Sequence, residues 1–409
     1  MKFRKAKFYQ NSTSLSGLAL QRFKRNKLSM FALIYICIFV IIAVLGYLLT
    51  PDKTPFANNQ NLELSTKKPG FKVKILNLKS NQPEKKSSIL LTMIYGKTND
   101  YEDIPIFSYK INGQFLEAEL FTGMTPNNGE KINYELTDIA FSIQPRTIIL
   151  KNKTVIFKEI SGKEQNIDLA ELQNLVRTKN IEVRTYLLGT DRFGRDLLSQ
   201  LIIGSRVSLS VGFIAVFISL IIGISLGLIS GYLGGKIDEL IIWFINVVWS
   251  IPTLLLVIAI TMALGKGFWQ VFIAVGLTMW VEVARVVRGQ VMSIRNKEFV
   301  EAGIAFGYSN FRILFRHVLP NILSPVIVIS AANFASAILI EAGLSFLGIG
   351  VQPPVPSWGT MIKEHYGYII LDYAYLAIIP GLAIMLMVLT FMIVGNGLRD
   401  ALDVKTVQD

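Results

Sequence analysis

Very few side chains in this sequence could perform catalysis or hold a metal ion. The 409 residues include one cysteine, Cys37, and only two histidines, His317 and His365. A lone histidine or cysteine does not make a metal site, because zinc and similar ions need three or four ligands. The patterns G-x-x-x-x-G-K-[ST], H-E-x-x-H and G-x-S-x-G are all absent from the sequence. We therefore expect no catalytic residues, no metal site and no ATP hydrolysis by this chain itself.

Acidic side chains within apolar stretches are the next candidates for chemistry. Glu341 is the sole acid of the apolar stretch 322–347, where a charge is costly and usually faces a cavity or a partner. A role in a transport pathway and a purely structural role both stay open for Glu341. Glu282 and Arg285 are three residues apart, which predicts an ion pair along one helix face. Pro252 predicts a kink that either a gate or ordinary packing could use.

Residues 298–321 combine a short helical pattern with two chain-breaking residues. Four aromatic or small residues recur at the spacing of one helix face: Phe299, Ala302, Gly303 and Phe306. Such a face could cover lipid or fill a shallow groove on a protein partner. Gly307 is suited to end this helix in a left-handed conformation, and Pro320 restricts the backbone before the next apolar stretch.

Six apolar stretches must position these residues. Hydrophobic residues make up 52% of the chain and charged residues 17%, whereas soluble domains are about a quarter charged. Each stretch is near the roughly 20 residues that a helix needs to cross a bilayer: 28–49, 207–229, 240–264, 268–283, 322–347 and 375–394. The first stretch is longer than the core of a signal peptide, so we expect an uncleaved membrane helix.

The distribution of charge predicts the orientation of these helices. Residues 1–27 contain eight basic and no acidic side chains, and the segment 285–316 has six basic residues against two acidic ones. Basic excess of this kind marks cytoplasmic segments. The net charge of +12 therefore indicates a membrane surface and no nucleic-acid partner. Six crossings predict a multi-pass protein of the cell (inner) membrane with both termini in the cytoplasm.

Residues 51–185 break this membrane pattern. They are charged, and they contain runs of alternating polar and apolar residues such as 71–75. Asn112-Gly113 predicts a hairpin turn, and Asp168 stands where a helix N-cap is expected. We expect a small β-rich domain, inserted between the first and second crossings and located outside the membrane on the extracytoplasmic side.

Three glycines in the second crossing predict a close helix contact. Gly223, Gly227 and Gly231 are spaced four residues apart and therefore share one helix face. A face without side chains allows another helix to approach closely in lipid.

The segment around residue 300 resembles a known signature. Glu301-Ala302-Gly303-x-x-x-Gly307, followed by Leu319-Pro320, is similar to the EAA loop of ABC importer permeases, with Gly303 where that family has alanine. In that family the loop forms a coupling helix that is seated in a cleft of the ATP-binding subunit. The resemblance therefore implies a set of coupling residues here: Glu298, Glu301, Ala302, Gly303, Gly307, Leu319 and Pro320.

Two further motifs are similar to those of the dipeptide/oligopeptide/nickel permeases. One runs from Leu188 to Asp196 and the other from Glu341 to Gly359. The resemblance covers about residues 1–50 and 186–405, but it does not cover 51–185, where that family has a much shorter loop. It implies an all-α polytopic membrane protein with six transmembrane helices, type I ABC importer-like. The β-rich extracytoplasmic domain between helices 1 and 2 is expected from the residues of 51–185 alone.

The predicted division of the chain follows from these observations. It comprises a cytoplasmic basic arm (1–27), a first transmembrane helix (28–50), the inserted domain (51–185), an interfacial segment (186–205), the permease transmembrane domain (206–397) with a cytoplasmic coupling loop (285–321), and a cytoplasmic tail (398–409). A stiff outer loop follows the fifth crossing. Two interpretations stay open: Trp358 anchors in the membrane interface, or the loop contacts a substrate-binding protein through these residues: Pro353, Pro354, Pro356 and Trp358.

The resemblance implies the membrane permease subunit of an ATP-driven ABC importer, forming half of a pathway for short peptides, with nickel as a minority alternative. It implies a second permease subunit, two ATP-binding subunits and an extracytoplasmic substrate-binding protein as partners, in a lipid bilayer. ATP and magnesium would bind to the partner ATPase subunits, and this chain would need no cofactor. Two alternatives remain: a secondary transporter or channel with Glu341 as its ion site, and a receptor or anchor whose outer domain does the work.

Overall fold

The structure is a computed structural model that describes residues 15–81, 88–144, 147–151, 153–265 and 267–402. The chain divides into two compact units. The helical unit comprises Met1–Ile41, Ser205–Glu364 and Ile378–Asp409, and the second unit comprises Ile42–Gly204 and His365–Ala377. The start of the predicted basic arm, Lys266 and the end of the predicted tail lie outside the described residues.

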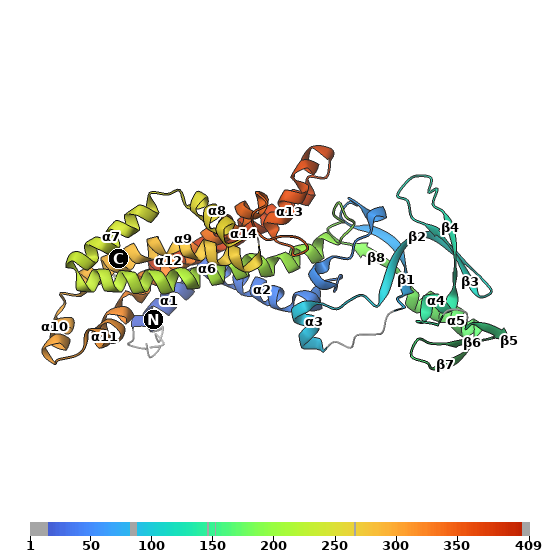
Figure 1. Ribbon diagram of the computed structural model, residues 1–409, viewed down its shortest axis with the longest axis horizontal. Helices are drawn as coiled ribbons and strands as arrows, with labels where there is room; N and C mark the ends of the chain where they lie inside the picture. The colour runs from blue at the N-terminus through green and yellow to red at the C-terminus, as the bar shows by residue number, and fades with distance from the viewer. Residues whose placement is uncertain (1–14, 82–87, 145–146, 152, 266, 403–409) are drawn as a thin grey trace, which may run out of the picture. The chain divides into compact units, whose positions relative to one another are not determined.

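Five helices of the described chain are long and apolar enough to cross a membrane. They are α2 (Lys27–Leu49), α6 (Leu197–Leu233), α9 (Phe268–Ile294), α12 (Leu319–Phe346) and α14 (Tyr375–Leu402) (Figure 1). A bent pair, α7 (Gly235–Trp249) and α8 (Thr253–Leu264), raises the number of candidate spans to six if it counts as one span. Five of the six predicted apolar stretches therefore coincide with one helix each, and the stretch 240–264 covers the bent pair α7 and α8.

The bend between α7 and α8 occurs at Pro252. The two helices are inclined by 90°, and Pro252 occupies the N-cap position of α8. Proline has no amide hydrogen and its ring clashes with the preceding turn, so a helix stops there. The predicted kink is thus a complete break.

Several predicted boundaries were wrong. Helix α6 begins at Leu197 and not at 207, α9 continues to Ile294 instead of ending at 283, and α14 continues to Leu402 instead of ending at 394. The extension of α9 carries Arg288, whose guanidinium donates two hydrogen bonds of 2.6 Å to Asp238 of α7. Paired in this way, a charged residue is tolerated in a helix that packs among other helices. The predicted loop 285–321 is correspondingly shorter.

The glycine face of α6 packs directly on α9. A Cβ atom on Gly223 would lie 2.5 Å from the Cβ of Val283, and one on Gly227 would lie 2.7 Å from the carbonyl oxygen of Ala284. Real side chains do not approach so closely, so only glycine permits this spacing. The prediction of a close helix contact is confirmed. Apolar side chains of α6, α9 and α12 complete the buried core of this unit: Val211, Phe272, Val275, Ala337 and Leu344.

Among its described residues, the inserted domain contains two antiparallel sheets (Figure 1). The larger has the order β4-β3-β2-β1-β8 and consists of β1 (Phe71–Lys79), β2 (Tyr101–Asn112), β3 (Phe115–Leu120), β4 (Lys131–Glu135) and β8 (Ile181–Tyr186). The smaller consists of β5 (Ile149–Lys151), β6 (Thr154–Lys158) and β7 (Glu164–Asp168). Three short helices accompany them: α3 (Ile89–Tyr95), α4 (Leu136–Ala140) and α5 (Leu169–Leu175).

Local sequence signals explain much of this domain. Asp168 caps α5, because its side chain accepts a hydrogen bond of 2.8 Å from the amide of Ala170. The predicted hairpin forms between β2 and β3, but Asn112 pairs with Phe115, so the turn residues are Gly113 and Gln114. Gly113 has a φ of +59°, as the first position of a two-residue turn requires. Strands β1 and β8, the first and last of the domain, are paired neighbours, with Phe71 opposite Tyr186.

Candidate functional site

Helix α10 (Glu298–Ala305) has one buried side and one exposed side. Val300 and Gly303 are buried, whereas Phe299, Ala302 and Phe306 are exposed. The expectation that Gly303 shares a face with these exposed residues is therefore wrong. Gly303 instead lies against Tyr308 and Ile313, and this position has room for a methyl group, since an added Cβ would be 3.6 Å from the nearest side-chain atom.

Gly307 ends α10 as predicted. It has a φ of +72°, and its amide donates to the carbonyl oxygen of Ile304. The amide of Tyr308 donates to the carbonyl oxygen of Gly303 at 3.0 Å. This pair of hydrogen bonds is a Schellman motif, which favours glycine at its left-handed position. Nothing lies within 4 Å of a Cβ added to Gly307, so the requirement for glycine is conformational and not steric.

Buried contacts fix α10 to the long helices. Val300 of α10 and Ile313 of α11 (Asn310–Ile313) belong to the same buried cluster as Val287 of α9 and Val326 of α12. A π-helical turn, η4 (Leu314–Val318), joins α11 to α12. Leu319 is half-buried against the same cluster. A displacement of α10 would therefore be transmitted to α9 and α12, because close-packed interiors are not freely deformable.

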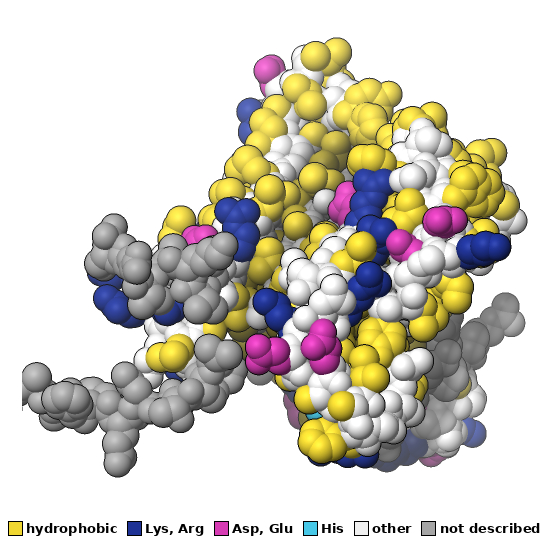
Figure 2. Space-filling model, turned by 90° about the vertical axis from the view of Figure 1, so that its left-hand side faces the viewer, with side chains coloured by type: hydrophobic (Ala, Val, Ile, Leu, Met, Phe, Trp, Pro, Cys, Tyr) yellow, Lys and Arg dark blue, Asp and Glu magenta, His cyan; other side chains and the backbone are white. Residues whose placement is uncertain are grey.

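The opposite side of this assembly is an exposed aromatic surface, which we call the α10–α11 surface. Phe306 is 77% exposed and Phe311 is 70% exposed. Figure 2 looks onto this end of the helical unit, where hydrophobic side chains lie among Lys, Arg, Asp and Glu side chains. Glu298 and Glu301 occupy the first turn of α10, where a negative charge is favourable. Pro320 is exposed in the first turn of α12. Exposed aromatic residues on a fixed support are typical of a protein-docking surface.

An aromatic stack lies beneath this surface and was not predicted from the sequence. The ring of Tyr308 is stacked on that of His317, with centroids 5.8 Å apart, and the guanidinium of Arg312 lies 4.0 Å from the Tyr308 ring. His317 therefore contributes to packing. This pair could not be recognised in the sequence, because Tyr308 and His317 are nine residues apart and do not share a helical or strand periodicity.

Glu341 is fully buried and is held by serine hydroxyls. Ser345 donates to one carboxylate oxygen at 2.7 Å, and Ser208 of α6 donates to the other at 3.4 Å. The same Ser345 hydroxyl accepts a hydrogen bond from the amide of Val351. The carboxylate therefore connects α12, α6 and the loop that follows α12. This geometry favours the structural role, and Glu341 does not border either cavity described below.

The proline-rich loop presents only part of its predicted contact set. Pro353 and Pro354 are exposed, whereas Pro356 and Trp358 are buried. The Trp358 ring packs edge-on against Phe39, with centroids 6.4 Å apart. Trp358 was expected at a surface, but it is enclosed because Gly359 allows the start of α13 (Trp358–His365) to touch the backbone of Ala342.

A cavity of about 330 Å³ lies beside the break between α7 and α8. Its lining includes Trp249 before the break and Thr253 after it, together with Thr278 and Glu282 of α9 and Ser336 of α12. Its volume falls within the range of roughly 300–1,000 Å³ that is usual for small-molecule sites. The mostly apolar lining with a few polar groups is also usual for such sites.

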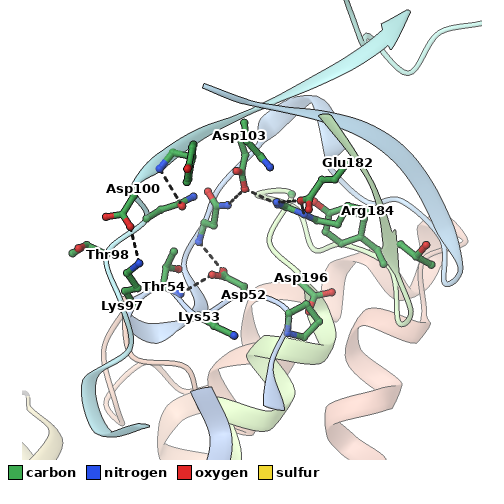
Figure 3. A pocket seen from close by; sticks show the side chains of 18 of the residues that line it. Asp52, Lys53, Thr54, Lys97, Thr98, Asp100, Asp103, Glu182, Arg184 and Asp196 are labelled. Carbon is green, nitrogen blue, oxygen red and sulfur yellow. Dashed lines mark hydrogen bonds and ion pairs between the residues drawn. The ribbon is translucent and has the colours of Figure 1, made fainter. Parts of the chain in front are cut away.

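A second, more polar cavity of about 520 Å³ lies in the second unit (Figure 3). Its charged residues are mostly paired with one another. Arg184 forms an ion pair of 2.5 Å with Asp103, and Lys97 forms one of 2.6 Å with Asp100. Burial raises the pKa of the Asp196 carboxyl above its ordinary value of 3.8, although hydrogen bonds from Ser199 act in the opposite direction. The first pair connects β8 to β2 across the intervening strand β1, and the second lies within the segment that precedes β2. These pairs stabilise the wall of the cavity, so the cavity is described here as a structural feature.

Comparison with known proteins gives the family. Residues 223–408 match the binding-protein-dependent transport system inner membrane component family, and residues 14–69 match the N-terminal TM domain of oligopeptide transport permease C. The chain is 42% identical over 220 residues to the oligopeptide transport system permease protein OppC of Haemophilus influenzae, which covers 54% of this chain and 70% of that protein. The chain belongs to this family of membrane permeases.

Other relatives of the permease have related names. It is 45% identical over 217 residues to the dipeptide transport system permease protein DppC of Alkalihalophilus pseudofirmus, covering 53% of this chain and 71% of that protein. It is 42% identical over 217 residues to the glutathione transport system permease protein GsiD of Escherichia coli, with the same coverage of both chains. The permease is also similar to a chain of an inward-facing structure of the MetNI methionine ABC transporter. The similar region covers 51% of the permease and 98% of that chain, at 18% identity and a TM-score of 0.43.

Proposed function

We propose that this permease carries short peptides across the cell membrane as one half of an ATP-driven importer. The relatives named above are permeases for oligopeptides, dipeptides and glutathione by their names, and all three cargoes are peptides. The cavity at the α7–α8 break lies among helices that would form the pathway. Nickel is the less favoured cargo, because the described lining of that cavity contains neither histidine nor cysteine.

The α10–α11 surface is the proposed contact with an ATP-binding subunit. The observation that carries this proposal is the combination of buried Val300 and Gly303 in one short helix with exposed Phe306 at its C-cap. Phe306 can enter a groove on a partner, while Val300 fixes the helix to α9 and α12. Closure of two ATP-binding subunits would then move the long helices and exchange outward and inward openings of the pathway. ATP and magnesium would be bound by those partners.

The remaining partners and the orientation follow from the same proposal. The α10–α11 surface and both termini would be cytoplasmic, which agrees with the basic residues around them. The inserted domain would then be extracytoplasmic, as would Pro353 and Pro354, which remain exposed for contact with a substrate-binding protein. A second permease subunit would complete the pathway.

A matched pair of variants tests the coupling contact. Phe306→Ala removes a 77% exposed ring from the α10–α11 surface, and Phe217→Ala removes a 64% exposed ring from α6. Loss of an aromatic anchor typically weakens a protein interface by about 2 kcal/mol, or roughly thirtyfold. Phe306→Ala should therefore lose the ATP-binding subunits during purification and lose ATP-dependent uptake, whereas Phe217→Ala should keep both. Equal retention of the subunits by both variants would contradict the proposal.

An ion-driven transporter that uses Glu341 is the second candidate, and the geometry disfavours it. An ion or proton site must be reached from one side of the membrane at a time, whereas Glu341 has 0% exposure and is held by two serines. Uptake that runs on an ion gradient in vesicles without ATP-binding subunits would restore this candidate.

A further inference from the structure

Glu282 occupies an unusual place for a charged residue. It lies 14 residues after the first residue of the 27-residue helix α9, which places it about 21 Å along the helix at 1.5 Å per residue. Its side chain is exposed and borders the cavity at the α7–α8 break. Glu282 is the second-last residue of the apolar stretch 268–283, and a carboxylate within such a stretch is disfavoured against lipid. This side of α9 must therefore face water, a ligand or another protein.

The expected internal partner of Glu282 is engaged elsewhere. Arg285 was predicted to form an ion pair with it, and that prediction was wrong. The Arg285 guanidinium donates a hydrogen bond of 2.9 Å to the side-chain oxygen of Asn246, and it lies 3.6 Å from the ring centroid of Trp249. Across the part of the chain that the structure describes, neither a hydrogen bond nor an ion pair reaches the Glu282 carboxylate.

One neighbour of Glu282 in the cavity, Thr278, offers a hydrogen-bond acceptor. Thr278 lies one turn before it on the same face of α9, and the Thr278 hydroxyl already donates its hydrogen to the carbonyl oxygen of Val275 at 2.8 Å. The lone pairs of that hydroxyl remain to accept. A carboxylate and an accepting hydroxyl together favour a ligand that is cationic and rich in donors. An ammonium group has three donors and no acceptor.

We propose that Glu282 receives the N-terminal ammonium group of the cargo peptide in the membrane pathway. The proposal rests on the peptide-transport function above, because the N-terminal ammonium is the cation that linear peptides have in common. Met279 and Leu339, which also border the cavity, would contact the apolar part of the first residue. A metal ion is a poorer fit, since a single carboxylate with two hydroxyls from Thr278 and Ser336 provides too few strong ligands.

The test compares two forms of one peptide in vesicles that contain the complete transporter and an excess of peptide-loaded binding protein. One form has a free N-terminus and the other is N-acetylated. We expect Glu282→Gln to slow uptake of the free form about tenfold, which corresponds to one charge-assisted hydrogen bond, and to leave uptake of the acetylated form unchanged. Glu282→Asp keeps a carboxylate and should therefore take up the free form at close to the parent rate. Glu239→Gln, which removes an exposed carboxylate of α7 outside the cavity, should behave like the parent.

The outcomes separate this inference from the function on which it rests. If the parent shows ATP-dependent uptake but Glu282→Gln slows both peptide forms equally or neither, the ammonium site is wrong and the transport function stands. If Glu282→Gln separates the complex during size-exclusion chromatography, Glu282 binds the second permease subunit and the inference is also wrong. If the parent transports no peptide in either form, the proposed function itself fails.

Discussion

A Cβ atom added to Gly227 of α6 would lie 2.7 Å from the carbonyl oxygen of Ala284 in α9. Two membrane helices are therefore in backbone contact over several turns, since Gly223 and Gly231 are equally confined. Gly227→Ala should force the helices apart and reduce stability by about 2 kcal/mol, a typical effect of overpacking. Gly343→Ala is the matched control, because nothing lies within 4 Å of its added methyl group. Thermal unfolding in detergent measures both, and equal melting temperatures would contradict the expectation.

The two glycines of the α10 segment should respond in opposite directions. Gly303→Ala places a methyl group 3.6 Å from its nearest neighbour and should stabilise α10 by roughly 0.5–1 kcal/mol, because alanine is the better helix former. Gly307→Ala should destabilise the helix end by about 1 kcal/mol, because of its φ of +72°. Hydrogen exchange at the Tyr308 amide reports both changes. Faster exchange in Gly303→Ala would show that the pocket beside Gly303 is not free.

A bulkier residue at Gly307 should also impair transport. The expected cause is the left-handed backbone conformation of Gly307, because an added side chain would meet no neighbour there. Gly307→Asn should therefore be milder than Gly307→Val, because asparagine tolerates this conformation and β-branched residues do not. ATP-dependent uptake and retention of ATP-binding subunits measure the effect. Wild-type uptake by Gly307→Val would count against a coupling role for this segment.

Two ion pairs of the polar cavity should differ in their importance for stability. The side chains of Arg184 and Asp103 are 27% and 4% exposed, whereas those of Lys97 and Asp100 are 44% and 18% exposed. Arg184→Met leaves a buried carboxylate without its cation and should destabilise the second unit by about 3–5 kcal/mol. Lys97→Met should cost less than about 1 kcal/mol. Limited proteolysis of the inserted domain distinguishes the two, and similar cleavage rates would refute the difference.

Asp196 predicts a pH dependence of the second unit. Its pKa is raised by burial, so the folded unit binds more protons than the unfolded chain between pH 3.8 and the raised value. Stability from this group is therefore greatest below pH 3.8 and decreases as the pH rises through that window. Asp196→Asn cannot titrate and should gain stability relative to the parent as the pH increases. Paired melting curves at several pH values measure this, and a difference that is constant with pH would exclude the effect.

Local signals were sufficient to predict the apolar helices, the glycine contact and the capping of α5. Each depends on neighbours in sequence: a run of apolar residues, a four-residue spacing, or an Asp beside the amide that it caps. The ends of α6 and α9 could not be predicted in this way. Within the extension of α9, Arg288 is paired with Asp238, which lies 50 residues earlier in the sequence, and a pairing over this range leaves no local signal.

The candidate site was predictable as a segment but not as a surface. The helical spacing identified the residues of α10, yet it could not determine that Gly303 faces inward, because that depends on packing against Ile313. Trp358 was misplaced for the same reason: the buried space that it fills exists only once Gly359 approaches Ala342. The three-residue spacing predicted an ion pair between Glu282 and Arg285. The Arg285 guanidinium instead contacts Asn246 and Trp249 of α7, which lie far from it in the sequence.

The pairing of Phe71 with Tyr186 has a consequence for how this permease is organised. Because the strands that begin and finish the domain are adjacent, the polypeptide leaves the sheet beside the place where it arrived. The two ends of the domain are therefore as close together as the ends of a tight turn, although more than a hundred residues lie between them. The domain therefore has the build of an insertion, because its two ends stay close together however many residues lie between them.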